Sequence, residues 1–447
     1  MTDTREPKSN MKDTGIPWIG EIPKEANICR LKFFSYMKGR IGWQGLKSKD
    51  FIDNGPYCVT GTDFVNGKIN WSTCYHVSEE RYEMDKSIQL QVGDLLVTKD
   101  GTIGKLAKVT ELPGKACLNS HLLIIRPTGN KFSNEYLYYV MLSDVFVNYY
   151  RYTSTGSIME SLSQEKTREF QFPLHDPSVQ QKIVRYLDRR CAAIDSLIAS
   201  KQALLEKLEE YRKAVITKAV MEGLNPSVIL TEGAIRWIGK FPSHWKVCKI
   251  KHCYHIVSGA TPPSHEQNWG GNIPWIGPAD MPDWGEISGG KRFLTKEGYA
   301  ACSTTMVPAG SIILSTRAPI GKVCIAKNSI CTNQGCKSLV ARDSARISNK
   351  FTAYCCVALQ KRLQNDGTGT TFQELSLQAL GDEPLVQPPI DEQISISNYL
   401  DAQCSSIDSA KATVERTIDK LNEYKQSLIT AAVTGKIDVP NIHPKEQ

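Results

Sequence analysis

The sequence has no apolar run approaching the roughly 20 residues that a membrane-spanning helix requires. Its first residues are polar and contain no apolar core, unlike a secretion signal. We predict a disordered tail at residues 1–14 and a cytoplasmic chain with no membrane partner. The composition is that of a soluble globular protein, since 41% of the 447 residues are apolar and 23% are charged.

Catalytic motifs are missing as well. The chain contains neither G-x-S-x-G nor H-E-x-x-H, and no glycine-rich dinucleotide fingerprint follows a strand. Asn225-Pro226-Ser227-Val228 departs from the Asn-Pro-Pro-aromatic motif of amino-methyltransferases. There are only 8 histidines, and a lone histidine is more often structural than catalytic. We therefore predict that the chain has no catalytic residue.

Metal-binding cysteine patterns are also absent. The 14 cysteines include no C-x-x-C pair. Cys248, His252, Cys253 and His255 lie close in sequence, but their spacing fits no usual zinc finger, and alternate residues of one strand point to opposite faces. Reduced cysteines and no metal are expected. The net charge of +7 permits an acidic partner such as nucleic acid without requiring one.

What the sequence does contain is a tandem duplication. Several segments recur in the same order, at a distance far beyond the period of a solenoid repeat. The pairs are IPWIGEIPKEANICRLK at 16–32 with IRWIGKFPSHWKVCKIK at 235–251, DLLVTKDGTIGKLAKV at 94–109 with SIILSTRAPIGKVCIA at 311–326, TGSIMESLS at 155–163 with TGTTFQELS at 368–376, and VRYLDRRCAAIDSLI at 184–198 with SNYLDAQCSSIDSAK at 397–411.

Each copy has a mixed half and a helical half. Short β-rich runs broken by Gly, Pro, Asn and Asp, together with one apolar aromatic run, predict an α+β domain. A segment of about 40 residues with an apolar heptad then predicts a helix of roughly 60 Å. The expected organisation is a first domain at 15–175, a helix at 176–232, a second domain at 233–388 and a second helix at 389–447.

The heptads predict an apolar seam on each helix. Such a narrow seam requires a helical partner, so we favour an intramolecular coiled coil between the two copies over packing of each helix on its own domain. The predicted seam residues are Ile183, Leu187, Ile194, Leu197, Leu204, Leu208, Tyr211 and Val215 in the first helix, and Ile396, Leu400, Ile407, Val414, Leu421, Tyr424 and Leu428 in the second.

The repeated Gly-Lys does not form a phosphate-binding P-loop. That loop needs G-x-x-x-x-G-K-[ST], but Lys99 and Thr316 stand where its first glycine belongs, and Leu106 and Val323 follow the lysines. A strand–turn–strand unit is the simpler prediction. Its polar residues suit nucleic acid, because Lys and Arg bind phosphate or guanine and Ser and Thr bind backbone or base.

These repeats resemble the specificity subunits of type I restriction–modification enzymes. The similarity rests on W-I-G-x-x-P at 18–23 and 237–242, G-D-x-L-x-T…I-G-K at 93–105, its second copy at 310–322, and P-P-I-D-E-Q at 388–393. It extends over nearly the whole chain after the tail. The first copy departs from it at 176–180, and it has Ala26 where the second has Trp245.

The resemblance implies a function for each part. Each α+β domain would be a target-recognition domain for one half of a bipartite, asymmetric double-stranded DNA site. The two helices would pair antiparallel and set the spacing. Modification subunits that bind S-adenosylmethionine and methylate adenine would dock on the helices. Restriction subunits that use ATP and magnesium would join for defence against phage DNA. The chain itself would bind no cofactor.

Candidate DNA contacts lie in the two Gly-Lys segments and in a second aligned segment of each copy, where Asn or Gln could recognise adenine. They are Thr98, Lys99, Thr102, Lys105, Asn119, Ser120 and His121 in the first domain, and Ser315, Arg317, Lys322, Asn333, Gln334 and Lys337 in the second. Two other functions remain open. One is a coiled-coil interaction protein whose β-rich domains bind protein or glycan, and the other is a self-sufficient enzyme.

Overall fold

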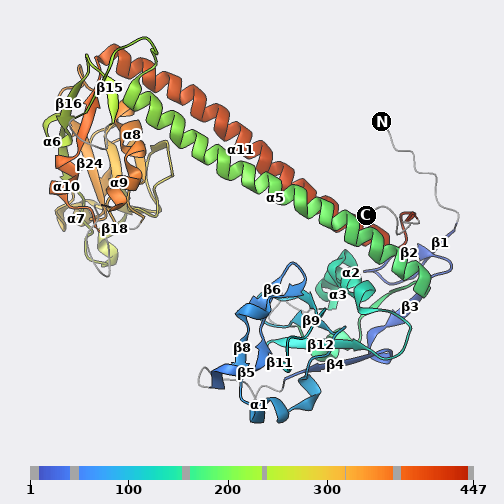
Figure 1. Cartoon of the computed structure of the whole chain (residues 1–447). Helices are drawn as coiled ribbons and strands as arrows, with labels where there is room; N and C mark the ends of the chain where they lie inside the picture. The colour runs from blue at the N-terminus through green and yellow to red at the C-terminus, as the bar shows by residue number, and fades with distance from the viewer. Residues whose placement is uncertain are drawn as a thin grey trace. The chain divides into compact units, whose positions relative to one another are not determined.

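The computed structural model describes residues 10–40, 50–153, 162–233, 239–317, 319–365 and 374–440. The chain divides into two compact units. Unit 1 comprises Met1–Lys201 and Arg416–Gln447, and unit 2 comprises Gln202–Glu415. Figure 1 shows an α+β domain in each unit, together with parts of the two long helices α5 (Pro177–Glu222) and α11 (Ile390–Val433).

The domain of unit 1 is built on a six-stranded sheet in the order β4-β12-β9-β10-β7-β6 and a three-stranded sheet in the order β11-β5-β8. Two antiparallel pairs, β1 with β2 and β3 with β13, lie outside these sheets. The strands are β1 Met11–Asp13, β2 Glu21–Pro23, β3 Asn27–Arg30, β4 Ser35–Gly39, β5 Phe51–Val59, β6 Phe64–Val65, β7 Lys68–Ile69, β8 Tyr75–Val77, β9 Leu95–Thr98, β10 Leu106–Lys108, β11 Ala116–Leu118, β12 Leu122–Pro127 and β13 Gln171–Leu174, and the helices are α1 Glu79–Glu83, α2 Asn134–Leu142, α3 Asp144–Thr153 and α4 Gln164–Arg168.

The domain of unit 2 repeats this plan. Its five-stranded sheet has the order β17-β24-β21-β22-β19, its three-stranded sheet has the order β20-β18-β23, and the outer pairs are β14 with β15 and β16 with β25. The strands are β14 Leu230–Glu232, β15 Lys240–Pro242, β16 Lys246–Lys249, β17 Tyr254–Ser258, β18 Trp269–Ile276, β19 Glu286–Ile287, β20 Arg292–Leu294, β21 Ile312–Ser315, β22 Val323–Ala326, β23 Cys331–Thr332, β24 Cys336–Ala341 and β25 Pro384–Gln387, and the helices are α6 Ile250–Cys253, α7 Lys296–Ala300, α8 Asn349–Ala358, α9 Gln360–Asn365 and α10 Leu377–Asp382.

The structure confirms the tandem α+β repeat. In both units a central hairpin, β9–β10 or β21–β22, pairs antiparallel with the next long strand, β12 or β24. Both hairpins also carry a short parallel strand, β7 or β19, on the other side. One expectation is wrong: Met11–Asp13, assigned to a disordered tail, pairs with Glu21–Pro23. Residues 1–9 lie outside the described part of the chain.

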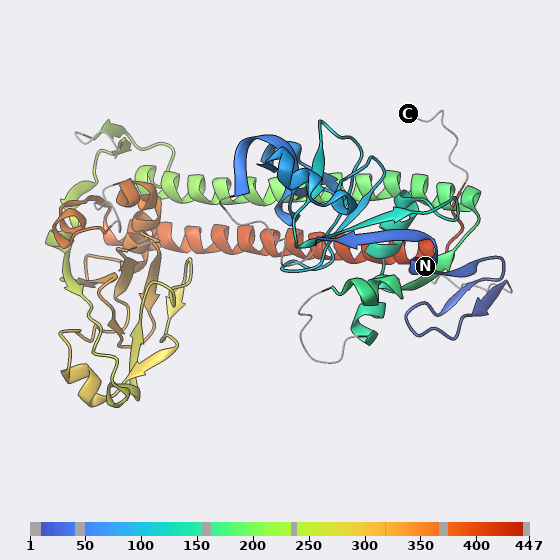
Figure 2. The ribbon, with the colours of Figure 1, turned by 90° about the horizontal axis from the view of Figure 1, so that it is seen from below.

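The antiparallel helix pair is also confirmed. In unit 1 the beginning of α5 lies beside the end of α11, and in unit 2 the end of α5 lies beside the beginning of α11 (Figures 1 and 2). Ion pairs join the helices in both units: Lys425 Nζ lies 2.6 Å from Asp195 Oδ1, and Lys411 Nζ lies 2.8 Å from Glu209 Oε2. Each pair also packs on its domain, because Leu187 and Leu400 are fully buried in the cores of their units.

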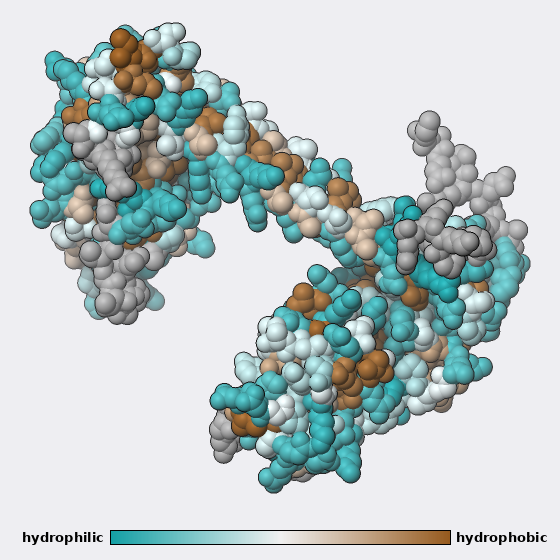
Figure 3. All heavy atoms as spheres, viewed as in Figure 1, coloured by the Kyte–Doolittle hydropathy of each residue, from teal (hydrophilic) through white to brown (hydrophobic). Residues whose placement is uncertain are grey.

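Four of the fifteen predicted seam residues are wrong by one position. Leu197, Leu204, Tyr211 and Tyr424 are 44%, 38%, 55% and 49% exposed, and the helices have apolar surface on the face shown in Figure 3. The residues one position later face the seam instead: Ile198, Leu205, Arg212 and Lys425 are all half-buried. The observed heptad is Leu187, Cys191, Ile194, Ile198, Lys201, Leu205, Leu208, Arg212, Val215 and Ala219 in α5, and Leu400, Cys404, Ile407, Lys411, Val414, Ile418, Leu421, Lys425, Leu428 and Ala432 in α11.

The other predicted seam residues are buried or half-buried. Ile183 and Ile396 are 2% exposed, but they precede the observed heptads and belong to the cores of the domains. The error arises because each helix has apolar residues on both sides of its central row. The second seam position of a heptad can lie either three or four residues after the first. When both positions hold apolar residues, the sequence pattern alone does not show which one faces the partner helix.

A buried glutamine joins the start of α11 to the domain before it. Gln393 is 1% exposed. Its Nε2 donates to the carbonyl oxygens of Pro388, at 2.8 Å, and Arg346, at 3.1 Å, while its Oε1 accepts from the backbone N–H of Ser348 at 2.8 Å. Ser348 in turn caps α8 through its hydroxyl.

Gln180 has the same role at the start of α5. Its Nε2 donates to the carbonyl oxygens of His175 and Lys131 at 2.7 and 2.8 Å, and its Oε1 accepts from the N–H of Ser133 at 3.4 Å. Ser133 caps α2. Both copies therefore have an equivalent glutamine at the start of the long helix, although the P-P-I-D-E-Q motif occurs only in the second copy.

Gln393→Ala should lower the free energy of unfolding of unit 2 by about 1–3 kcal/mol, because it leaves buried backbone groups without partners. Thermal or urea unfolding of the full chain would measure this loss. Gln202→Ala, an exposed change on α5 in the same unit, is the control and should alter stability by less than about 0.5 kcal/mol. Equal effects of the two variants would contradict the anchoring role.

Candidate DNA interface

The Gly-Lys turn of unit 1 connects β9 to β10 over residues 99–105. Thr98, at the end of β9, is 3% exposed. Its hydroxyl donates to the carbonyl oxygen of Thr102, at 2.5 Å, and accepts from the N–H of Lys105, at 2.9 Å. Gly101 and Gly104 have φ values of 71° and 80°, which residues other than glycine rarely adopt. The turn is thus fixed by one hydroxyl and two glycines.

The Gly-Lys turn of unit 2, over residues 316–322, is fixed in the same way. Ser315 is fully buried; its hydroxyl donates to the carbonyl oxygen of Pro319 at 2.6 Å and accepts from the N–H of Lys322 at 2.9 Å. Gly321 has a φ of 90°. Thr98 and Ser315 were expected to contact DNA; both hydroxyls are bonded within their turns, and a DNA contact by either residue stays a prediction.

The exposed residues of the two turns differ. In unit 1 Thr102 and Lys105 are exposed and Lys99 is half-buried. In unit 2 Arg317 is exposed, whereas the Lys322 ammonium bonds the carbonyl oxygen of Met281 and Asp283 Oδ1, both at 3.2 Å.

Lys322 also lines a cavity of about 510 Å³ within unit 2, together with Arg212 of α5 and Lys411 of α11. Its expected phosphate contact remains a prediction, and its present partners lie outside the turn.

A second loop lies directly beside each turn. In unit 1 it connects β11 to β12 through Asn119, Ser120 and His121, and the carbonyl oxygen of His121 accepts from the N–H of Lys99 at 2.9 Å. The side-chain oxygen of Asn119 accepts from the N–H of Ser120. His121 is exposed, and its Nδ1 lies 3.1 Å from Oδ2 of Asp100 in the turn.

In unit 2 the corresponding loop connects β23 to β24. The oxygen of the Asn333 side chain accepts from the N–H of Gly335 at 2.9 Å, so this side chain shapes its own loop, as asparagine often does. Gln334 is exposed and accepts a hydrogen bond from Thr261. Lys337 was expected to contact DNA, but it lies in β24 and is only 8% exposed.

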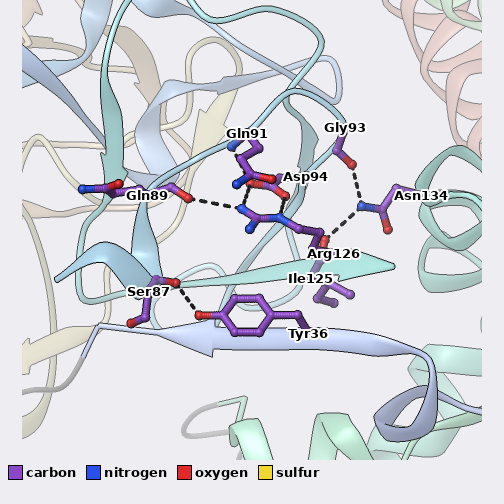
Figure 4. A network of polar contacts seen from close by, with 9 residues as sticks. All are labelled: Tyr36, Ser87, Gln89, Gln91, Gly93, Asp94, Ile125, Arg126 and Asn134. Carbon is purple, nitrogen blue, oxygen red and sulfur yellow. Dashed lines mark hydrogen bonds and ion pairs between the residues drawn. The ribbon is translucent and has the colours of Figure 1, made fainter. Parts of the chain in front are cut away.

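A buried ion pair joins the start of β9 to β12 in unit 1 (Figure 4). Asp94, which precedes β9, is 1% exposed and accepts two hydrogen bonds from Arg126, at 2.6 and 2.8 Å. These bonds raise the pKa of the Arg126 guanidinium. Asp94 also accepts from the N–H of Gln91 at 2.7 Å, and Asn134 of α2 donates to the carbonyl oxygen of Gly93 at 2.6 Å.

The equivalent region of unit 2 has the asparagine hydrogen bond but lacks the ion pair. Asn349 donates to the carbonyl oxygen of Gly310 at 2.8 Å, as Asn134 does to Gly93. Strand pairing places Ser311 and Val340 where unit 1 has Asp94 and Arg126. The glycine carbonyl oxygen that begins this motif therefore has the same amide partner in both copies, whereas the aspartate and its ion pair occur in unit 1 alone.

Cysteines and histidines form no metal site within the described ranges, where no three His, Cys, Asp or Glu side chains are grouped to hold an ion. Burial raises the pKa of the Cys324 and Cys336 thiols to about 12, so they stay protonated at neutral pH. His255 contacts Arg342, and burial lowers the pKa of His175, whose Nε2 bonds the carbonyl oxygen of Val433 at 2.8 Å. No helix in these ranges is both long and apolar enough to cross a membrane.

The architecture defines a class of protein: an α+β fold present twice, in which each copy packs with parts of two long helices. The family model described as the type I restriction modification DNA specificity domain matches residues 43–210 and 242–418, one match for each copy. The chain belongs to this family of DNA specificity subunits, whose role in type I restriction–modification systems is recognition of the DNA sequence. The interaction-protein and enzyme alternatives are not favoured.

Curated relatives and solved structures agree. The putative type I restriction enzyme MjaX specificity subunit of Methanocaldococcus jannaschii is 24% identical over 97% of both chains. The MjaIX specificity subunit of the same organism is 36% identical over 36% of this chain and 38% of its own. The HsdS subunit from Thermoanaerobacter tengcongensis shares the fold, with a TM-score of 0.51 and 17% identity over 93% of this chain and 98% of that chain. A chain from a study of type I R-M complex assembly gives a TM-score of 0.72, also at 17% identity, over 93% and 99%.

Proposed function

We propose that each unit recognises one half of a bipartite, asymmetric site on double-stranded DNA. The observation that carries this is the pair of turns with one framework and different exposed residues. Thr98 and Ser315 make the same bonds, whereas the exposed side chains around them differ in charge and shape. Two copies of one fold whose turns present different exposed side chains are suited to recognising two different DNA sequences.

We further propose that α5 and α11 set the spacing of the half-sites and dock modification subunits. The helices have 46 and 44 residues, roughly 65 Å at the usual rise, which exceeds the roughly 34 Å of one DNA turn. In this proposal the chain acts in the cytoplasm and catalyses no reaction. Adenine methylation with S-adenosylmethionine belongs to the modification subunits, and ATP- and magnesium-dependent cleavage to restriction subunits.

An exchange of loops tests the assignment of one unit to one half-site. The full chain, assembled with its modification subunits, is used to select binding sites from random DNA. Residues 99–105 and 119–121 are then replaced by the sequences at 316–322 and 333–335. One half-site should change and the other should stay, and each changed base pair should cost the original site about 10- to 100-fold in affinity.

The unaltered complex is the control for this exchange. Failure of that complex to select any split site would overturn the proposed function. A change in both half-sites after the exchange would contradict the assignment of one half-site to each unit.

A further inference from the structure

One exposed position of the Gly-Lys turn has opposite charge in the two units. Lys99 and Thr316 are equivalent, because each N–H bonds the neighbouring loop, at His121 O or Gly335 O, at 2.9 and 2.8 Å. The carbonyl oxygen of each accepts from the N–H of Leu162 or Leu375, at 2.7 and 2.9 Å. The next residue is therefore equivalent as well, and it is Asp100 in unit 1 and Arg317 in unit 2.

In unit 2 a carboxylate from a distant segment holds Arg317. Both Nε and one terminal nitrogen of Arg317 lie 2.9 Å from Oε2 of Glu374, and the two residues also form an isolated backbone bridge. The side chains are 44% and 36% exposed, so they are accessible to DNA. Glu374 occupies the side-on edge of the guanidinium. The two terminal nitrogens form the end-on edge, which can donate together to O6 and N7 of guanine.

In unit 1 the same position presents a hydrogen-bond acceptor. Asp100 is bonded to His121 through Oδ2, and its side chain is 35% exposed. A carboxylate accepts from the N4 amino group of cytosine and has no hydrogen to offer to guanine O6 or N7. The partner of Asp100 comes from the β11–β12 loop, whereas the partner of Arg317 lies just before α10.

We propose that Asp100 and Arg317 are specificity-determining residues and that this one position makes the two half-sites different. Arg317, positioned by Glu374, selects guanine at one base pair of one half-site. Asp100, positioned by His121, selects cytosine at one base pair of the other. This inference rests on the proposed function, since it names the residues through which each unit distinguishes bases.

The test measures base preference with the full chain assembled with its modification subunits. Sites are selected from random DNA, and competition then gives the relative affinity for each base at every position. Arg317→Lys keeps the charge but removes the fork, so preference for one guanine should fall about 10- to 100-fold while affinity for sites lacking that guanine changes little. Asp100→Asn should alter one base pair of the other half-site only.

Glu374→Gln tests the positioning role separately. It should weaken the same guanine preference, and the double variant Arg317→Lys/Glu374→Gln should lose no more than Arg317→Lys alone, because Glu374 acts through Arg317. Arg346→Lys is the matched control: this exposed arginine of unit 2 pairs with Asp343, and its replacement should leave every base preference unchanged. Co-elution with the modification subunits and an unchanged melting temperature establish that each variant is folded.

The outcomes separate the two proposals. If the unaltered complex selects no split site, the proposed function fails. If it selects one but Arg317→Lys and Asp100→Asn retain every base preference, or lower affinity for all sequences alike, the two residues contact phosphate only and this inference is overturned. A change of both half-sites by either variant overturns it as well.

Discussion

Asp94→Ala should lower the free energy of unfolding of unit 1 by about 3 kcal/mol. The carboxylate is 1% exposed and accepts two bonds from Arg126, whose side chain is 26% exposed. Removing one member of a buried ion pair leaves the other without compensation, which typically costs about 3–5 kcal/mol; the partial exposure of Arg126 places this variant at the lower end. Urea unfolding of the full chain, followed as two transitions, would measure the loss.

The second copy supplies the control. Unit 2 has Ser311 and Val340 at these positions and buries no ion pair there. The double variant Asp94→Ser/Arg126→Val should therefore recover most of the stability that Asp94→Ala loses, because it removes both charges. A double variant as unstable as the single one would show that the ion pair is not the cause.

Leu187→Ala should destabilise unit 1 by about 2–5 kcal/mol. Leu187 is fully buried where the start of α5 meets the domain and the end of α11, in the same core as Leu428 and Ile429. Truncation leaves a cavity in addition to the lost burial of the side chain. Thermal unfolding of the full chain gives the loss, and the transition of unit 1 should move while that of unit 2 stays.

Leu197→Ala is the comparison within the same unit. Leu197 was predicted to lie in the seam but is 44% exposed, so its replacement should cost less than about 0.5 kcal/mol. Losses of equal size at Leu187 and Leu197 would favour the originally predicted seam over the observed one.

The sequence was sufficient to predict the duplication, the α+β class and the antiparallel helices. The duplication, the α+β class and the pairing of the helices rest on repeats and on apolar periodicity, which are local signals, whereas the antiparallel direction rests on the family resemblance. The phase of the seam was not predictable in full, because Leu197 and Ile198 are adjacent apolar residues and either completes a heptad with Ile194. Burial against the facing helix decides between them, and that is a tertiary property.

Side-chain partners were the least predictable part of the site. Thr98 and Ser315 suit DNA by residue type, yet the bonds that occupy their hydroxyls depend on the conformation of the turn. Glu374 is 57 residues from Arg317 in sequence, and no motif connects them. The equivalence of Asp100 and Arg317 became clear only from the backbone bonds around them, since the turns differ most in sequence at this point.

The division of the chain has a consequence for synthesis on the ribosome. Unit 2 is one continuous segment, whereas unit 1 needs Arg416–Val433 to complete its core. About 200 residues separate its two segments, and translation at ~5–20 residues per second takes roughly 10–40 s to cross them. During that time the apolar face at the start of α5 has no helix to cover it. The second recognition unit can therefore finish folding before the first, and a chaperone has its opportunity to bind the nascent chain in this interval.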